Sequence, residues 1–507
     1  MNPIYPDSAR FSDLYEAGKP VLVWTEMVAD LETPVAAYLK LADGEDFSFL
    51  LESVEDGDIG GRYSIIGLQP DLLFRVENGQ PQVNRRAALA ADDFDPMDAA
   101  PLDALRMILA ETRLDIPESL PPMSAGLFGY MAYDMVRFME DLPDTNPDVL
   151  GVPDGLFIRP TVIAVFDSIA HKVMLVTPVR PAAPDSKGDN AAAAYEKAEA
   201  RLSAAYDKMH GSLPEPELTP PNEMAEPVSN MSQQAYFDMV EKSKAYIEAG
   251  DIFQVVVSQR FSVPFTLPPF DLYRALRRVN PSPYLFFLNM RDFAIVGSSP
   301  EVLVGVKDRE VNIRPIAGTR KRGANAEQDS AIGADLLADE KERAEHLMLL
   351  DLGRNDAGRV SEIGSVKVNT AFGLQKTSHL IHIVSDVTGT LRAELDEIDA
   401  LTAGFPAGTV SGAPKIRAME IIDELEPERR GVYSGCVGYF SANGDMDTCI
   451  ALRTALVKDE TLYVQAGGGV VYDSTPQYEY DETVNKATAL FRAAEVALTL
   501  AAERKNR

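Results

Sequence analysis

The chain has 507 residues, 46% hydrophobic and 25% charged, which is ordinary for a globular protein of roughly two to four domain-sized units. Its formal net charge of −30 argues against nucleic acid and anionic membrane surfaces as partners, because both bind basic protein faces. The sequence contains no signal-peptide pattern and no apolar run of about 18 residues, so no membrane span is expected. The two cysteines, Cys436 and Cys449, predict no disulfide framework, and a reducing cytoplasm is the expected location.

The first part of the chain combines short strands with one helix. Apolar runs bounded by Gly, Asp and Pro are typical of antiparallel strands, and they occur at 20–24, 47–53, 62–68, 72–77, 161–167 and 172–178. An alanine-rich segment over 191–209 predicts a helix. The proline- and glutamate-rich stretch 211–230 predicts a linker or a long surface loop. We therefore expect an N-terminal domain over residues 1–210 and a second domain over residues 231–500.

The second part of the chain also contains runs of strands. Ser232 can cap a helix that runs to about Glu248 and ends at Gly250. Further strands are expected at 251–265, 284–290, 293–299, 301–315, 365–374, 380–391 and within 435–472. Helices are expected at 271–279, 327–356, 413–425 and 476–504. Consecutive strands without strict βαβ alternation predict an α+β fold whose large antiparallel sheets are covered by helices.

Two glutamate pairs with the same spacing stand out. Glu342 and Glu345 lie in one predicted helix, and Glu479 and Glu482 lie in another. Residues three apart share a helix face, so each helix can direct two carboxylates at one point. Proteins usually hold Mg²⁺ through one or two carboxylates together with water and substrate oxygens. Two such helices facing one pocket would hold Mg²⁺ and an anionic substrate, although solvated helix faces also carry such pairs.

Three glycine-rich segments have the composition of ligand-binding turns. Residues 314–320 end a strand in a Gly-Thr turn, which can offer backbone N–H groups to an anion. Residues 405–415 lead into a helix but lack the Walker A pattern, and glycines in 465–470 allow a ligand to approach the backbone. Each segment by itself is also compatible with an ordinary turn or flexible loop. Arg453 lies in an otherwise apolar strand, where its charge needs a partner such as a carboxylate.

In combination, these segments resemble the chorismate-utilising enzymes, and among them the large synthase subunits of anthranilate synthase. The matching motifs run in family order from about residue 250 to 490 and are PIAGTRKRG, ERAEHLMLLDLGRND, HLIHIVSDVTGTL, FPAGTVSGAPKIRAMEIID, YSGCVGYF, CIALRTA, QAGGGVVYDS and YEYDETVNKA. Weaker matches, FLLES and GRYSIIG, extend the resemblance over nearly the whole chain. The resemblance implies antiparallel sheets packed as a sandwich, with helices on the outside and a chorismate-binding catalytic domain in residues 231–500.

The resemblance also implies a Mg²⁺-dependent lyase that makes anthranilate and pyruvate from chorismate and ammonia. Glu345 and Glu482 would hold Mg²⁺, with Glu342 and Glu479 in support. The residues that resemble chorismate contacts are Gly318, Thr319, Tyr433, Arg453, Gly467, Gly468 and Gly469, and Arg453 would pair with the enolpyruvyl carboxylate. Glu301 is similar to the acid that protonates the departing C4 hydroxyl, and His382 and Thr409 match positions that assist the loss of pyruvate.

Two positions separate the relatives by the nucleophile that they use. Isochorismate and salicylate synthases carry a water-activating lysine where this chain has Gln254, which we therefore count among the catalytic positions. Aminodeoxychorismate synthases carry a ring-attacking lysine where this chain has Ala317. Glutamine and alanine favour ammonia that adds directly at C2. Aminodeoxychorismate synthase, isochorismate synthase and a non-catalytic tryptophan-binding relative remain the alternatives.

The resemblance further implies a protein partner and a feedback inhibitor. The sequence shows no glutamine amidotransferase pattern, so a separate amidotransferase subunit would supply the ammonia, in a heterotetramer by family analogy. Tryptophan would inhibit this first step of its own biosynthesis by binding at the LLES and NPSPY segments. Its contacts would be Ser53, Pro283, Tyr284 and Leu285.

Overall fold

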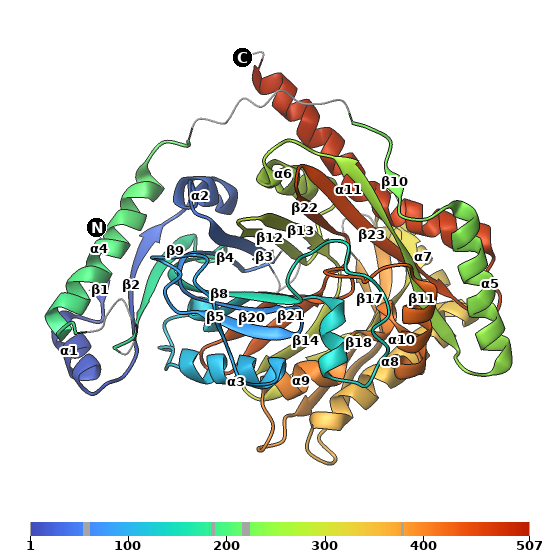
Figure 1. The fold of residues 1–507 in the computed structure, drawn as a ribbon, viewed down its shortest axis with the longest axis horizontal. Helices are drawn as coiled ribbons and strands as arrows, with labels where there is room; N and C mark the ends of the chain where they lie inside the picture. Colours follow the sequence, from blue (N-terminus) through green and yellow to red (C-terminus); the bar gives the residue numbers. More distant parts are fainter. Residues whose placement is uncertain are drawn as a thin grey trace.

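The computed structural model describes residues 2–53, 61–181, 183, 188–214, 224–376 and 380–505. All strand pairings in these residues are antiparallel, and they form two layers that share the long strands β4 (Tyr63–Glu77) and β8 (Gly155–Asp167) (Figure 1). The register between β4 and β8 shifts between Pro70 and Leu72. Because such an irregularity bends a strand, the two halves of β4 can belong to different layers.

The remaining strands extend each layer outward from β4 and β8. The first layer contains, in order of pairing, β1 (Ile4–Tyr5), β2 (Val21–Val28), β9 (Lys172–Val179), then β8, β4, β3 (Phe47–Ser53), β12 (Tyr284–Met290), β13 (Phe293–Ser299), β22 (Thr454–Lys458), β23 (Thr461–Val470) and β11 (Gln254–Pro264), with β10 (Val228–Ser229) and β19 (Gly412–Ala413) on β11. In the second layer, β5 (Gln80–Asn84) pairs with β4, and β6 (Asp95–Pro96) pairs with β5. Outward from β8 the order of pairing is β7 (Gly126–Met131), β20 (Cys436–Ser441), β21 (Met446–Ile450), β14 (Val302–Lys307), β15 (Glu310–Ile313) and β18 (Leu380–Thr390). Both β16 (Ile316–Lys321) and β17 (Lys367–Lys376) also pair with β18.

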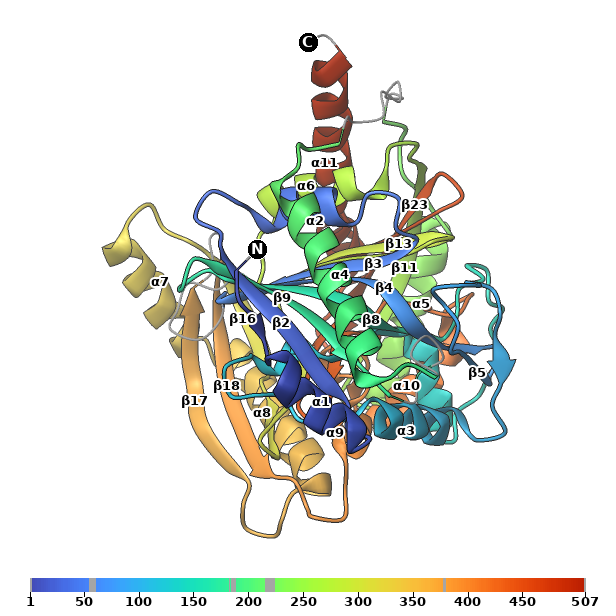
Figure 2. The same cartoon turned by 90° about the vertical axis from the view of Figure 1, so that its left-hand side faces the viewer.

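Helices cover the outside of the strand layers (Figure 1). They are α1 (Ser8–Glu16), α2 (Pro34–Leu41), α3 (Pro101–Thr112), α4 (Ala191–His210), α5 (Gln233–Ala249), α6 (Pro269–Val279), α7 (Ala326–Ala338), α8 (Glu340–Val360), α9 (Glu397–Gly404), α10 (Lys415–Leu425) and α11 (Pro476–Lys505), with short 3₁₀ turns η1 (Pro122–Ser124), η2 (Tyr133–Phe138) and η4 (Gly408–Val410). In the side view, α7, α8, β17 and β18 lie together at one end of the molecule (Figure 2). No described helix is both long and apolar enough to cross a membrane.

The buried side chains show how the layers are held together. One large hydrophobic cluster consists only of strand and loop residues and fills the space between the layers. Two others join strands to the covering helices. In β12 the side chains alternate: Phe286 and Leu288 face the inner cluster, and Leu285 and Phe287 face α2 and α6. Burial on both faces explains why this strand is a continuous apolar run rather than an alternating one.

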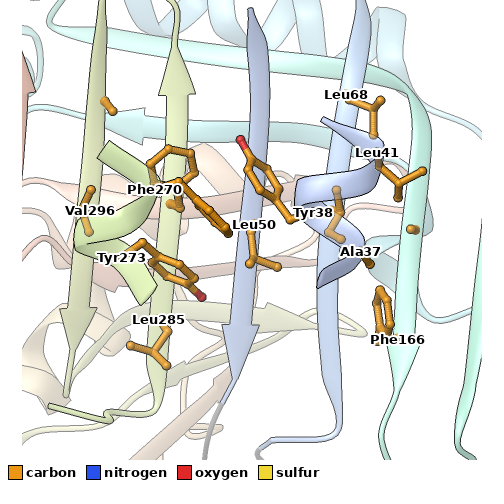
Figure 3. Packing of buried hydrophobic residues seen from close by; sticks show 14 of the residues in the cluster. Ala37, Tyr38, Leu41, Leu50, Leu68, Phe166, Phe270, Tyr273, Leu285 and Val296 are labelled. Atoms are coloured by element: carbon orange, nitrogen blue, oxygen red, sulfur yellow. The ribbon is translucent and has the colours of Figure 1, made fainter. Parts of the chain in front are cut away.

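The outer cluster around α2 and α6 is built on aromatic rings (Figure 3). Tyr38 from α2 stacks on Phe270 from α6, with 4.4 Å between ring centroids, and Leu50 of β3 and Leu285 of β12 belong to the same cluster. A pair of this kind adds about 0.5–1.5 kcal/mol beyond the area it buries. The cluster therefore joins an N-terminal helix and strand to a helix and strand from the second half of the chain.

The predicted fold class is confirmed, but several predicted elements differ from the observed ones. The strand expected over 301–315 is a hairpin of two strands, β14 and β15. The helical region expected over 327–356 is divided, because Asp339 has extended backbone and its side chain accepts hydrogen bonds from the N–H groups of Lys341 and Glu342. This N-cap begins α8 directly after the end of α7. Periodicity could not show the break, because both helices carry many polar residues.

The division into domains at 1–210 and 231–500 stays a prediction. Strand β3 pairs along its whole length with β12, and β7 pairs with β20, so sheet hydrogen bonds run across the predicted boundary. Residues 215–223 of the predicted linker lie outside the described residues, and its end is structured, since Val228 and Ser229 pair with β11.

Two short connections carry the chain from one layer to the other. Pro300 and Glu301 join β13 of the first layer to β14 of the second. Residues 451–453, ending at Arg453, join β21 of the second layer to β22 of the first. The N–H of Ile450 donates to the carbonyl of Glu301 (3.0 Å), so the two connections lie side by side. Glu301 and Arg453 therefore come from remote parts of the sequence to one place between the layers.

Candidate active site

A cavity of about 190 Å³ lies at this crossing point. Its walls come from β11, β16, β18, β23, η4, α11 and the two connections. The predicted site residues that line it are Glu301, Thr319, His382, Thr409, Tyr433, Arg453 and Gly467. The fold thus brings together residues that are up to 166 positions apart, and polar groups converge on a concave space, as expected of a ligand site.

Glu301 is the buried acid of this cavity. Glu301 is 8% exposed, and its Oε1 accepts a hydrogen bond from the hydroxyl of Thr409 at 3.0 Å. Burial raises the pKa of Glu301 to about 8, although the Thr409 hydrogen bond and the charges of Arg453 and Lys486 act in the opposite direction. Glu301 therefore holds a proton at neutral pH and can act as a general acid.

His382 faces the cavity as a neutral imidazole. It is the cross-strand neighbour of Thr319, and its Nδ1 lies 3.1 Å from the carbonyl oxygen of Gly318 and 3.2 Å from Oγ1 of Thr319. A carbonyl can only accept, so Nδ1 carries the proton and Nε2 keeps its lone pair. Burial lowers the pKa of His382, with the positive charge of Arg453 as a smaller contribution. At neutral pH the ring can therefore accept a proton or a hydrogen bond through Nε2.

Arg453 brings a positive charge that has no carboxylate partner among the residues that the structure describes. Its side chain is half-buried and forms no ion pair with any carboxylate of the described residues. Its backbone has φ of 47°, a left-handed conformation that is uncommon outside glycine, and its carbonyl accepts from the N–H of Ser298 at 3.2 Å. Burial lowers the pKa of the Arg453 guanidinium, and nearby Glu301 partly offsets this. Such a group is suited to a carboxylate supplied by a ligand.

The three glycines of β23 lie against three different side chains. A Cβ on Gly467 would lie 2.7 Å from the hydroxyl of Tyr433, inside the cavity wall. A Cβ on Gly468 would lie 2.8 Å from Oε2 of Glu479, and one on Gly469 would lie 2.7 Å from Nε2 of Gln254. A side chain at any of the three positions would therefore require these neighbouring side chains to move.

Not every predicted position reaches the cavity lining. Gly467 does, but Gly468, Gly469 and Gln254 lie outside it, and Gly318 contributes through the carbonyl that holds His382. Gln254 is buried, and its Oε1 has no hydrogen-bond partner in the described part of the chain. The predicted substrate contacts at Gly318, Gly468 and Gly469, and the catalytic role of Gln254, stay predictions.

The four predicted metal ligands lie near one another on α8 and α11. Glu479 is 3% exposed, and burial raises its pKa to about 7, with a further contribution from Glu482. Burial also raises the pKa of Glu345, and the charges of Glu342 and Glu482 add to this effect. The negative charge of Glu482 thus acts on both Glu345 and Glu479, and such repulsion between carboxylates favours a bound cation.

The carboxylates form only part of a metal site. Glu342 pairs with Arg320 at 3.0 Å and Glu482 pairs with Lys486 at 2.9 Å, while the buried Oε2 of Glu479 has no hydrogen-bond partner in the described part of the chain. Within the described ranges, no three carboxylate, imidazole or thiol groups are arranged closely enough to hold a metal ion. The donor set nevertheless fits Mg²⁺, which prefers oxygen ligands and retains several waters.

Sequence reasoning missed several residues of the cavity wall. Lys486 donates to the carbonyl of Gly467 and to Glu482, both at 2.9 Å, and so links the cavity to the glutamates. Its position four residues after Glu482 was a signal for this placement, because such residues share a helix face. The apolar residues Val256 and Leu490 also line the cavity, and nothing in their local pattern distinguishes them from ordinary core residues.

A second cavity, of about 150 Å³, lies between the layers and is lined by residues of β3, β4, β12, β20 and β21. Ser53, Tyr284 and Leu285, three of the four residues expected to contact tryptophan, line it, while Pro283 is buried beside it. Asp447 is also in the lining: its carboxylate accepts a hydrogen bond from the Tyr284 hydroxyl at 3.2 Å, and burial raises its pKa to about 6. The cavity thus combines apolar walls with a half-buried carboxylate, as a site for an apolar amino acid requires.

Comparisons with known proteins agree with this geometry. A family model described as chorismate binding enzyme matches residues 46–492. Anthranilate synthase component 1 of Cereibacter sphaeroides is 54% identical over 484 residues, which are 95% of this chain and 96% of that protein. The protein of the same name from Pseudomonas aeruginosa is 48% identical over 479 residues, which are 93% of this chain and 95% of that protein.

Solved structures extend the comparison to the fold. The crystal structure of anthranilate synthase component I from Streptococcus pneumoniae is 38% identical, with a TM-score of 0.75 over 92% of this chain and 99% of that one. The menaquinone-specific isochorismate synthase of Escherichia coli shares the fold at 18% identity, with a TM-score of 0.70 over 96% of this chain and all of that one. The chain therefore belongs to the chorismate binding enzyme family, in the group of the anthranilate synthase component 1 proteins.

Proposed function

We propose that this protein is the large subunit of a Mg²⁺-dependent anthranilate synthase, which converts chorismate and ammonia to anthranilate and pyruvate in the first step of tryptophan biosynthesis. The observation that carries the proposal is a cavity in which Thr409 holds the buried, protonated Glu301 near the unpaired Arg453. Chorismate has two carboxylates and a C4 hydroxyl, so its conversion requires cations for binding and an acid for the leaving hydroxyl.

The reaction proceeds in two stages. Ammonia attacks C2, two ring double bonds shift, and the C4–O bond breaks while Glu301 gives its proton to the leaving hydroxyl, which departs as water. In the second stage the C2 proton is lost and the C3–O bond breaks, so the ring becomes aromatic. The released enolpyruvate gains a proton and becomes pyruvate. Nε2 of His382 is available as proton acceptor in this second stage, while the hydroxyl of Thr409 keeps its hydrogen bond to Glu301 and can accept another through its oxygen.

The four glutamates are the residues that would hold the metal. Glu345 and Glu482 would bind it directly, and Glu342 and Glu479 would orient its waters. When bound, Mg²⁺ supplies positive charge that orients the ring carboxylate of chorismate and stabilises negative charge on it. The unpartnered Oε2 of Glu479 supports this assignment, because a buried carboxylate oxygen without a donor is costly unless a ligand satisfies it.

The residues near the site favour ammonia over the alternatives. Ala317 lines the cavity and has no amine that could attack the ring, as an aminodeoxychorismate synthase would need. Gln254 is an amide that cannot activate water as a lysine does in an isochorismate synthase. Neutral ammonia is itself a nucleophile and needs neither group. These two positions therefore favour anthranilate as the product.

The ammonia would come from a separate glutamine amidotransferase subunit, component II, in a heterotetramer. An amidotransferase of this kind needs a reactive thiolate. Both cysteines of this chain are buried, and burial raises the pKa of Cys436 to about 12 and that of Cys449 well above its usual value. Neither thiol is therefore suited to release ammonia from glutamine, which supports an external source.

A product assay tests the proposed function. The purified chain, given chorismate, Mg²⁺ and excess ammonium at mildly alkaline pH, is expected to form fluorescent anthranilate without any amidotransferase, and EDTA should abolish the signal. Restoring Mg²⁺ after EDTA should restore the rate, which controls for irreversible damage. Isochorismate or aminodeoxychorismate as the sole product would show that Gln254 or Ala317 was misinterpreted. Binding of tryptophan without any turnover of chorismate would favour a non-catalytic relative.

The second cavity supports feedback inhibition by tryptophan at Ser53, Pro283, Tyr284 and Leu285. The indole would occupy the apolar part, and the ammonium group would pair with the Asp447 carboxylate. Asp447 and Cys449 of β21 line this cavity, and β21 leads directly into the connection that ends at Arg453. The N–H of Ile450 in β21 also binds the carbonyl of Glu301. Occupation of the cavity can therefore act on the connections that carry the two proposed active-site groups.

Replacing Asp447 by asparagine should weaken tryptophan binding by about 10- to 100-fold, the value of a hydrogen bond to a charged group. Calorimetric titration of tryptophan measures the affinity, and assays without tryptophan should give unchanged kcat and KM. The wild-type affinity should also fall below about pH 6, where Asp447 becomes protonated. Asp154, whose pKa burial also raises to about 6, lies outside the cavity, so Asp154→Asn is the matched control. Equal tryptophan affinity in Asp447→Asn and wild type would contradict the assignment.

A further inference from the structure

A fully buried ion pair lies directly behind the wall of the active-site cavity, the one lined by Glu301 and Arg453. Arg430 is 1% exposed and Glu426 is 4% exposed. Their contact is bidentate: Nε of Arg430 donates to Oε2 at 2.9 Å and Nη2 donates to Oε1 at 2.6 Å. Burying two charges costs several kcal/mol per ion, and apolar residues of the same volume are often equally stable. The pair therefore calls for an explanation beyond stability.

The guanidinium of Arg430 also binds three separate segments of the cavity wall. Nη1 donates to the carbonyl of Val410 in η4 at 2.7 Å, and Nη2 donates to the carbonyl of Val256 in β11 at 2.6 Å. The guanidinium lies over the ring of Tyr433, 5.6 Å from its centroid. Val256, Val410 and Tyr433 all line the cavity. One side chain thus fixes the relative positions of a strand, a turn and a loop.

Through Ser258, Glu426 also holds a fourth residue of the cavity wall, Gln465. Its Oε1 accepts from the N–H of Ser258 at 2.8 Å and from the Ser258 hydroxyl at 2.7 Å. Nε2 of Gln465, which lines the cavity, donates to the same hydroxyl oxygen at 2.9 Å. Ser258 has one hydroxyl proton and uses it on Glu426, so its oxygen can only accept. The orientation of the Gln465 amide therefore depends on the buried carboxylate.

We infer that Arg430 is a positioning residue of the cavity, and that together with Glu426 it holds Val256, Val410, Tyr433 and Gln465 in the arrangement that the reaction needs. The inference rests on the proposed function for its kinetic consequences, but the geometry that it describes does not. Val410 follows Thr409, whose hydroxyl binds Glu301. A displaced Val410 carbonyl would therefore also displace the hydrogen bond that holds the acid.

Arg430→Lys tests the inference, because lysine keeps the charge but cannot make two parallel hydrogen bonds to Glu426 and reach both carbonyls. The matched control is Arg159→Lys. Arg159 is 2% exposed and pairs with Asp71 at 2.7 Å and 3.0 Å, in a core region outside both cavities. Calorimetry should show comparable losses of melting temperature in the two variants. Calorimetric titration of tryptophan should show that the second cavity is intact in both.

Steady-state kinetics, expressed per folded molecule, then separate positioning from stability. Arg430→Lys should lower kcat for chorismate by about 10- to 100-fold, since a misplacement of about 1 Å can cost 10²-fold. KM should change much less, because Arg430 does not touch the substrate. The alkaline limb of the pH profile should move upward, because a weakened Thr409 hydrogen bond no longer lowers the pKa of Glu301. Arg159→Lys should keep kcat within about twofold of the wild type.

Crystal structures of the two variants give a readout that does not depend on the reaction. Displacement of the Val410 carbonyl and the Tyr433 ring in Arg430→Lys, without displacement in Arg159→Lys, supports the inference even if chorismate is not the substrate. An unmoved wall overturns it. Equal losses of kcat in the two variants would overturn it as well, because a structural role alone would then suffice.

Discussion

Replacing Glu301 by glutamine is expected to lower kcat for anthranilate formation by about 10²–10⁴-fold, the usual contribution of a general acid. Glutamine has the shape of a protonated glutamate and can still accept the Thr409 hydrogen bond, but it has no proton to give to the C4 hydroxyl. KM for chorismate should change little, because the cations that bind the substrate remain. Stopped or continuous assays of anthranilate fluorescence at saturating chorismate measure the loss.

The pH dependence of this variant distinguishes an acid from a merely structural carboxyl. Burial raises the pKa of Glu301 to about 8, so the wild-type kcat/KM should fall as the pH rises through this value and the acid loses its proton. The residual activity of Glu301→Gln should lack this alkaline limb. Glu397→Gln is the control, because Glu397 is also buried but pairs with Arg113 outside the cavity. A fall in kcat of Glu301→Gln that is no larger than in the control would contradict the role of the acid.

Although Glu301→Gln lowers the activity, it should raise the stability of the free protein at high pH. Below pH 4.5 Glu301 is protonated in the folded and the unfolded chain, so it has no effect on stability. Between pH 4.5 and about 8 the unfolded chain releases this proton while the folded protein retains it, so the folded wild type loses stability. The loss is about 1.4 kcal/mol per pKa unit. Glu301→Gln cannot ionise and should melt higher than the wild type at pH 8 to 9, but not at pH 4.5, by calorimetry.

The sequence predicted a strand or helix correctly where one pattern, such as a continuous apolar run or a pair of helix caps, covers the whole element. Apolar runs identified β3, β9 and β12, and Ser232 and Gly250 marked the ends of α5 correctly. The predicted strands 62–68 and 72–77 proved to be one strand, β4, because the irregularity near Gln69 interrupts its pattern without ending it. A local pattern cannot distinguish a bent strand from two strands, since that depends on which neighbours pair with each half.

The site shows a similar limit. Family motifs led to Glu301, His382 and Arg453, whose chemistry is visible in their residue types. Arg430 and Lys486 were not found, because an arginine beside a helix end and a lysine on a helix are usually surface residues. Their roles depend on burial and on the carbonyls that they reach, which are formed by strands far away in the sequence. Such contacts follow from the assembled fold only.

Replacing Arg453 by methionine is expected to reduce kcat/KM for chorismate by about 10²–10³-fold, mainly through KM, because a buried charge pair that loses one partner costs about 2–5 kcal/mol. Methionine keeps much of the length of the side chain but cannot pair with the enolpyruvyl carboxylate. An inhibitor that carries a hydroxyl group at C3 instead of the enolpyruvyl ether should bind both proteins equally well. Arg260→Met is the control, since Arg260 is buried but pairs with Glu428 outside the cavity.

The melting temperature of Arg453→Met, measured with and without chorismate, should show whether Arg453 binds the ligand or supports the fold. Arg453 has no protein carboxylate as partner in the described residues, and with Glu301 protonated its nearest acid is neutral. Removing it therefore relieves a cost of burial, and Arg453→Met should melt no lower than the wild type without ligand. Adding chorismate should raise the melting temperature of the wild type but scarcely that of the variant. Arg260→Met should show the reverse, a lower melting temperature with a normal response to chorismate. A destabilised Arg453→Met with normal chorismate binding would mean that Arg453 supports the fold rather than the substrate.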